Sequence, residues 1–97
     1  MTETESALVA KAAAGSADAF GALVKRFERP VFNLILRMVN DPAEAEDLAQ
    51  ETFLKAYRRL DTYDAAYRFS SWLLKVAHNV AIDHLRRRRP GHESLDE

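Results

Sequence analysis

The chain has no cysteine and few of the residues that interrupt helices, with three glycines and three prolines among its 97 residues. Without cysteine it can form neither a disulfide nor a thiolate metal site, and it has no thiol nucleophile. No apolar run approaches the roughly 20 residues that cross a membrane. The opening M-T-E-T-E-S also lacks the basic start and apolar core of a signal peptide. We therefore expect a cytoplasmic chain.

Catalytic and metal-binding signals are also missing. No serine lies beside a plausible histidine and acid, and no glycine-rich loop could cradle a phosphate. His78, Asp83 and His84 are potential ligands, but they lack a further ligand and an ordered spacing. We expect no enzymatic activity, no metal and no cofactor.

Helix-forming residues dominate the composition, which is 47% hydrophobic and 30% charged, and they predict one compact all-α domain of three to four helices. A short helix is expected over residues 6–14, ending at Gly15, and Ser16 is a candidate N-cap for a long second helix. Pro30 within that helix predicts a kink or a break near Arg29. The second helix keeps an apolar face made of Phe20, Leu23, Val24, Phe27, Val31, Leu34, Ile35 and Met38.

The third helix has the clearest start signal. Asp41 is a candidate N-cap, Pro42 takes the first helical position, and Glu44 follows three residues after the cap, as in a capping box. The expected inward side chains are Ala45, Leu48, Ala49, Phe53, Ala56 and Leu60. The expected outward ones are Glu44, Asp47, Gln50 and Glu51, and acids near a helix start also suit the helix dipole.

The stretch from Tyr67 to Arg89 predicts a fourth helix with two unlike sides. Its apolar face consists of Phe69, Trp72, Leu73, Val76, Ala77 and Val80. Lys75, Asn79 and Arg86 lie on another side and face outward. A helix that is buried on one side, basic on the other and fringed with aromatics suits nucleic-acid binding, because cations meet phosphates and rings stack on unpaired bases.

Charge is separated along the chain although the net charge is only −1. Residues 41–51 carry five acidic and no basic residues, whereas residues 52–89 carry nine basic and three acidic ones. Such poles fit a protein that offers an acidic surface to one partner and a basic surface to another. Many helical proteins, however, carry such blocks of charge only as solvent-exposed faces. The charge distribution alone favours this second interpretation over two partner surfaces.

Several residues of the fourth helix and its entrance have a structural alternative. Trp72 is expected in the core rather than stacked on a base. Tyr63 and Tyr67 could bind a base or simply cover the helix junction. The arginines at 86–89 could be a solvated helix end, but four adjacent cations before Pro90 favour phosphate contact.

Two strings at this separation carry a family resemblance. The third helix reads D-P-A-E-A-E-D-L-A-Q-E-T-F-L-K-A-Y, and the fourth reads F-S-S-W-L-L-K-V-A-H-N-V-A-I-D-H-L-R-R-R. Together, behind a phenylalanine-rich helix, they resemble region 2 of the extracytoplasmic-function (ECF) group of bacterial sigma factors, in the sigma-70 family. The resemblance spans residues 19–89. It implies a promoter-recognition subunit of RNA polymerase that acts in transcription initiation.

The resemblance implies two partner surfaces. In that family the acidic helix docks on the clamp helices of the polymerase β′ subunit, and the matching positions here are Glu46, Asp47, Leu48, Gln50 and Glu51. Leu48 and Phe53 could instead be core residues. For Phe53 we prefer the core. The family binds the non-template strand of the promoter minus-ten element through the loop before the fourth helix and the exposed side of that helix. The matching residues are Asp61, Thr62, Tyr63, Tyr67, Arg68, Lys75, Asn79, Arg86 and Arg87.

The family pattern is not complete in this sequence. Residues 1–89 are expected to correspond to region 2, and residues 90–97 have the composition of a linker. Nothing after Pro90 resembles the second helical domain, with its helix-turn-helix, that complete members carry, so we expect an isolated domain. The family also implies an anti-sigma factor as a partner, although no residue points to it. The alternative from another class is a helical interaction module that binds only proteins, and Asn79 beside a loop of aromatics argues against it.

Overall fold

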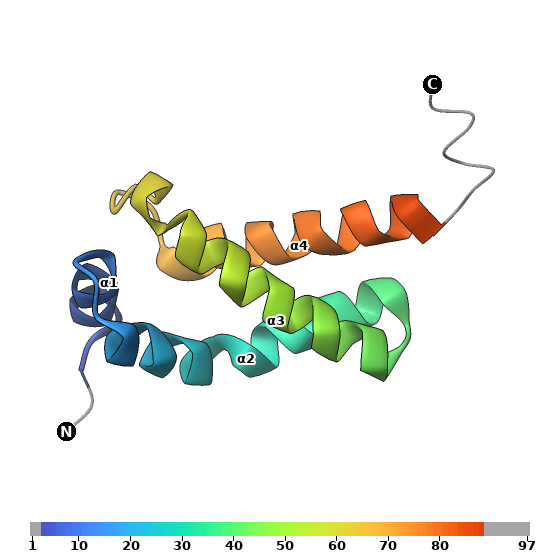
Figure 1. The fold of residues 1–97 in the computed structure, drawn as a ribbon, viewed down its shortest axis with the longest axis horizontal. Coiled ribbons are helices and arrows are strands. Elements are labelled where there is room, and N and C mark those ends of the chain that lie inside the picture. Colours follow the sequence, from blue (N-terminus) through green and yellow to red (C-terminus); the bar gives the residue numbers. More distant parts are fainter. Residues whose placement is uncertain (1–2, 89–97) are drawn as a thin grey trace.

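Four α-helices and one turn of 3-10 helix form the part of the chain, residues 3–88, that this computed structural model describes. They are α1 (Glu5–Ala13), α2 (Ala17–Val39), α3 (Pro42–Arg58), η1 (Leu60–Thr62) and α4 (Phe69–Arg88). No strand occurs in this range, so the all-α prediction is confirmed. Each of α2, α3 and α4 packs on the other two, while α1 packs on the first half of α2 (Figure 1).

The helix starts follow from local capping side chains. Ser16 accepts a hydrogen bond from the Ala19 amide at 3.0 Å, which confirms it as the N-cap of α2. Asp41 caps α3, because its Oδ1 accepts from the amides of Ala43 and Glu44 at 3.0 and 3.2 Å. Gly15, at a φ of +112°, provides the left-handed turn between α1 and α2.

Pro30 does not interrupt α2, which runs without a break from Ala17 to Val39. Pro30 is exposed, so water can satisfy the carbonyl that loses its amide partner. Val31, which follows it directly, and Ile35, one turn further on, are fully buried, and their burial opposes a break at this point. Of the two outcomes predicted near Arg29, a kink or a break, the break does not occur.

The core lies where α2, α3 and α4 meet, and its smallest members set how closely the helices approach. Ala45, Ala56, Ala77 and Ala81 are all fully buried. All six inward positions predicted for the third helix are buried, although Leu60 falls in η1. The sequence reading missed Ala81 and also Thr52, whose hydroxyl donates to the Leu48 carbonyl at 2.8 Å and so needs no water.

Candidate nucleic-acid interface

The two sides of α4 are as different as its sequence predicts. Its inward face is buried or half-buried along its length, from Phe69 to Ala81. Lys75, Asn79 and Arg86 are all exposed, which confirms their outward orientation. The core therefore holds α4 in one rotation about its axis, with an amide and cations on the open side.

The loop between η1 and α4 is held by its own side chains. The Thr62 hydroxyl donates to the Arg59 carbonyl at 2.6 Å, and Asp64 Oδ1 accepts from the Ala66 amide at 2.9 Å. The Tyr63 hydroxyl donates to the Tyr67 carbonyl oxygen. These bonds order the loop before any ligand arrives, which lowers the entropy lost on binding.

Aromatic rings join this loop to the first turn of α4. The Tyr63 ring lies 5.5 Å from that of Phe69 and 5.4 Å from that of Trp72, measured between centroids. Tyr63 thus covers the helix junction, whereas Tyr67 is 69% exposed. Burial raises the pKa of the Tyr63 hydroxyl, and the carboxylates of Glu5 and Asp64 raise it further.

A pocket of about 380 Å³ opens between the loop and α4. Its lining residues are Thr62, Tyr63, Asp64, Tyr67, Ser71, Trp72 and Lys75. Trp72 is half-buried and serves both the core and the pocket wall, so its assignment to the core alone was incomplete. The pocket combines aromatic surface with hydroxyl and carboxylate oxygens and one cation, which suits a planar, polar-edged ligand beside a phosphate.

The predicted DNA-binding residues divide into three groups. Thr62, Tyr63, Tyr67 and Lys75 line the pocket. Asp61 and Arg68 are exposed on the loop outside the lining, and Asn79, Arg86 and Arg87 are exposed further along α4.

Two further residues that line the pocket, Asp64 and Ser71, were not among the residues predicted to bind DNA. Ser71 could have been predicted, because it precedes Lys75 by four residues and Asn79 by eight on the same side of the helix.

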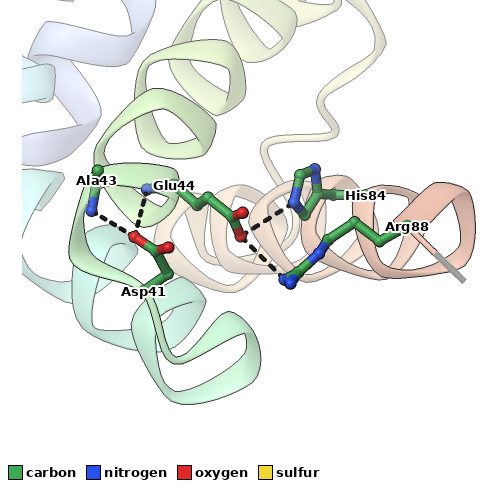
Figure 2. A network of polar contacts seen from close by, with 5 residues as sticks. All are labelled: Asp41, Ala43, Glu44, His84 and Arg88. Carbon is green, nitrogen blue, oxygen red and sulfur yellow. Dashed lines mark hydrogen bonds and ion pairs between the residues drawn. The ribbon is translucent and has the colours of Figure 1, made fainter.

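Glu44 connects the start of α3 to the end of α4, as Figure 2 shows. Its Oε1 lies 3.2 Å from His84 Nε2 and accepts a hydrogen bond from Arg88 Nη1 at 3.1 Å. This contact corrects two expectations, because Glu44 is not free on the outside of α3 and its carboxylate does not complete a capping box with Asp41. It also shows that Arg88, one of the arginines expected to meet phosphate, has an ion-pair partner within the protein.

The acidic surface of α3 is present with one exception. Glu46, Asp47, Gln50 and Glu51 are exposed, but Leu48 is only 5% exposed. Leu48 therefore belongs to the core in this structure, because its helical position turns it toward α2 and α4, and its assignment to a docking surface is corrected. Phe53 is also buried, as preferred from the sequence.

A groove of about 640 Å³ runs between α2 and α3 beside this acidic surface. Glu46, Gln50 and Phe53 line it from α3, and Phe32 and Arg29 line it from α2. The groove thus combines apolar, amide and charged side chains, a mixture that also occurs in protein–protein interfaces.

Within residues 3–88, no group of three or more His, Cys, Asp or Glu side chains is placed to hold a metal ion. In the same range no helix is long and apolar enough to cross a membrane.

The class of the chain is a small all-α domain that carries an aromatic-lined pocket beside an exposed basic helix end. The family model for Sigma-70 region 2 matches residues 23–90, well over half of the chain, so the chain belongs to that family. Its similarity to named ECF sigma factors places it in the ECF group.

Three relatives illustrate the match. The ECF RNA polymerase sigma factor SigW of Bacillus subtilis is 40% identical over 76 residues, covering 78% of this chain and 41% of that protein. The RNA polymerase sigma-H factor of Pseudomonas aeruginosa is 41% identical over 90 residues, covering 91% of this chain and 47% of that protein. BldN of Streptomyces coelicolor, another ECF sigma factor, is 43% identical over 83 residues, covering 84% and 31%. The chain thus spans less than half the length of each of these relatives.

A solved structure shares the fold. It is the NMR structure of an engineered region 2 of sigmaE in complex with GTAAAA, with a TM-score of 0.82 and 39% sequence identity. The match covers 90% of this chain and 97% of that one.

Proposed function

We propose that this domain is the part of an ECF sigma factor that binds core RNA polymerase and the non-template strand of the promoter minus-ten element. In this proposal α3 contacts the β′ clamp helices, and the loop with α4 holds single-stranded DNA. The domain acts in the cytoplasm and performs no chemical step. An anti-sigma factor that controls access to these surfaces is part of the same proposal, as the family resemblance implies.

The pocket between the loop and α4 is the observation that carries the DNA part of the proposal. Extracting a base from the stack costs a few kcal/mol, and stacking on aromatic surface returns about 1–3 kcal/mol per base. Tyr63 and Trp72 offer that surface, while Thr62, Asp64 and Ser71 offer polar atoms near a base edge. The related sigmaE region 2 was solved with GTAAAA, which supports a single strand as the ligand here.

The exposed side of α4 extends this site along the strand. Lys75 lies at the pocket wall, and Asn79 follows one helical turn later. An asparagine amide has both a donor and an acceptor and can read a base edge. Arg86 and Arg87 are exposed near the end of the helix and would meet backbone phosphates, adding affinity and salt dependence rather than sequence preference.

The polymerase part of the proposal depends on the open side of α3. The carboxylates of Glu46, Asp47 and Glu51 and the Gln50 amide are exposed on one preformed helix. Such groups can form oriented, charge-assisted hydrogen bonds to arginines of a partner helix. The adjacent α2–α3 groove adds apolar surface at Phe32 and Phe53.

A binding titration tests the DNA proposal. Labelled single-stranded GTAAAA and a hexamer of the same bases in scrambled order are titrated with the chain at fixed salt, and anisotropy is read. We expect tighter binding of one order than of the other. Ser71→Phe should abolish the difference by filling the pocket, whereas Ala10→Phe, at an exposed position of α1, should preserve it. Equal affinity for both hexamers in the wild type would remove the pocket as a base-reading site.

A further inference from the structure

Glu44 is an acidic residue of α3 whose side chain turns away from the rest of the acidic surface. Glu46 and Asp47, which follow it in α3, are exposed, but the Glu44 side chain is only 30% exposed. Capping does not explain this orientation: the Asp41 carboxylate satisfies the amides of Ala43 and Glu44 (Figure 2), and within residues 3–88 the Glu44 carboxylate accepts no bond from the Asp41 amide, as a capping box would require. The Glu44 carboxylate is therefore available for a separate role.

That carboxylate joins two helix ends that are far apart in sequence. One oxygen contacts both His84 and Arg88, at 3.2 and 3.1 Å. The acid lies in the first turn of α3 and the cation in the last turn of α4, so each also opposes the partial charge of its own helix end. The His84 side chain is 25% exposed and lies against the same carboxylate oxygen.

Arg88 differs from the other described arginines of the run, Arg86 and Arg87, in having an ion-pair partner. Arg86 and Arg87 are exposed and form no ion pair with any residue between 3 and 88. Arg88 instead has its charge compensated by a carboxylate of the same molecule. A cation that is already paired with a carboxylate is less available to neutralise a phosphate, so it displaces fewer of the counterions condensed on the nucleic acid, whose release drives sequence-independent binding.

We propose that Glu44 is a positioning residue that limits sequence-independent DNA binding, by holding Arg88 against α3 and away from the phosphate backbone. The inference rests on the DNA part of the proposed function. It assigns to Glu44 a role in specificity: with one phosphate contact fewer, a larger share of the binding free energy comes from the pocket and Asn79.

The dependence of affinity on salt measures this role directly. For a single strand, the slope of log K against log salt changes by about 0.7 for each phosphate neutralised. Labelled single-stranded oligo-dT is titrated with the wild type, Glu44→Gln, Arg88→Gln and the double variant, from 50 to 200 mM NaCl. Asp18→Asn, an exposed acid on α2 with no ion pair in the described range, is the matched control.

Glu44→Gln should make the slope steeper by about 0.7, an additional loss of about 2.6-fold in affinity across that salt range. Arg88→Gln alone should leave the slope unchanged, and the double variant should return to the wild-type slope, because only a released Arg88 reaches phosphate. Asp18→Asn should keep the wild-type slope. A purely structural role of Glu44 would alter thermal stability without this pattern.

A shallower slope for Arg88→Gln alone, or an unchanged slope for Glu44→Gln, overturns the inference. The Arg88→Gln result decides by itself if Glu44→Gln does not fold. Absence of binding by the wild type at every salt concentration would instead refute the DNA part of the proposed function, so the two failures are distinguishable.

Discussion

The hydroxyl of Tyr63 donates a hydrogen bond to the backbone carbonyl of Tyr67, which closes the loop in front of α4. The ring of the same tyrosine packs edge-on against Phe69 and tilted against Trp72. One side chain therefore ties the loop both to itself and to the core. Tyr63 is thus both a lining residue of the pocket and a link between the loop and α4.

Replacing Tyr63 with phenylalanine removes the hydroxyl and keeps the ring. A hydrogen bond of this kind contributes about 0.5–1.5 kcal/mol, and an exposed one lies at the lower end. We expect Tyr63→Phe to weaken GTAAAA binding by a few fold through a less ordered loop, with little loss of thermal stability. Anisotropy titration and circular dichroism melting measure the two effects. A large loss of stability with unchanged affinity would contradict a role in ordering the loop.

The raised pKa of Tyr63 also predicts a pH dependence of stability. The folded state holds the phenol proton more tightly than the unfolded chain, where the ordinary pKa is 10.0. The stabilisation is therefore complete below pH 10.0 and is lost as pH rises through the folded pKa. Urea unfolding of the wild type and of Tyr63→Phe at pH 9 to 11 measures the difference. Stability should fall more steeply with pH in the wild type, and parallel curves would contradict the prediction.

The N-cap of α3 should contribute measurably to stability. Asp41 satisfies two backbone amides at the start of α3, and loss of such a cap costs about 1 kcal/mol. We expect Asp41→Ala to lower the free energy of unfolding by about this amount in urea denaturation, while Asp41→Asn retains most of it. Equal losses in the two variants would show that the charge, rather than the cap, stabilises the helix.

The polymerase proposal predicts sensitivity at the open face of α3. Asp47→Lys should weaken binding to a β′ clamp-helix fragment by about tenfold or more, since it replaces an attraction by a repulsion, and Gln50→Ala should weaken it less. Asp18→Lys makes the same change of charge on α2 and is the control. Isothermal titration calorimetry gives the affinities. Unchanged affinity in both α3 variants would remove α3 from the interface.

Base preference and overall affinity for DNA should depend on different residues of α4. Asn79→Ala should reduce the preference for one base by about 1–3 kcal/mol and leave the salt slope unchanged, because the amide reads an edge rather than a phosphate. Arg86→Ala should weaken all single strands alike and make the salt slope shallower by about 0.7. Titrations over a set of single-base variants of GTAAAA supply both numbers. If Asn79→Ala keeps every preference, sequence reading resides in the loop.

Local features of this fold could be predicted from the sequence because they depend on residues close together in the chain. Ser16 and Asp41 cap helices through amides two or three residues away, and the apolar stripe of α4 follows helical spacing. The break expected beside Pro30 does not occur, because the local penalty of proline is outweighed by the burial of Val31 and Ile35, which depends on distant helices.

The sequence could predict most residues of the candidate site, but not the ion pair between Glu44 and Arg88. The loop and the exposed side of α4 were identified from residue types and the family pattern. The contact of Glu44 with Arg88 spans 44 positions in sequence, and the local signal at Glu44, three residues after Asp41, predicted a capping box instead. Thr52 was missed for a different reason: its partner is local, since its hydroxyl donates to the Leu48 carbonyl four residues earlier, but a polar residue type is not expected at a fully buried position.

The most direct test of the whole account is an NMR titration of the ¹⁵N-labelled chain with single-stranded GTAAAA. We predict chemical-shift changes at the amides of Thr62, Asp64, Ser71 and Lys75, which line the pocket, and at Asn79 beyond it. The exposed acidic positions of α3 should not shift, because the proposed DNA site does not include them. Shifts centred on the α2–α3 groove, with none at the pocket, would contradict the account.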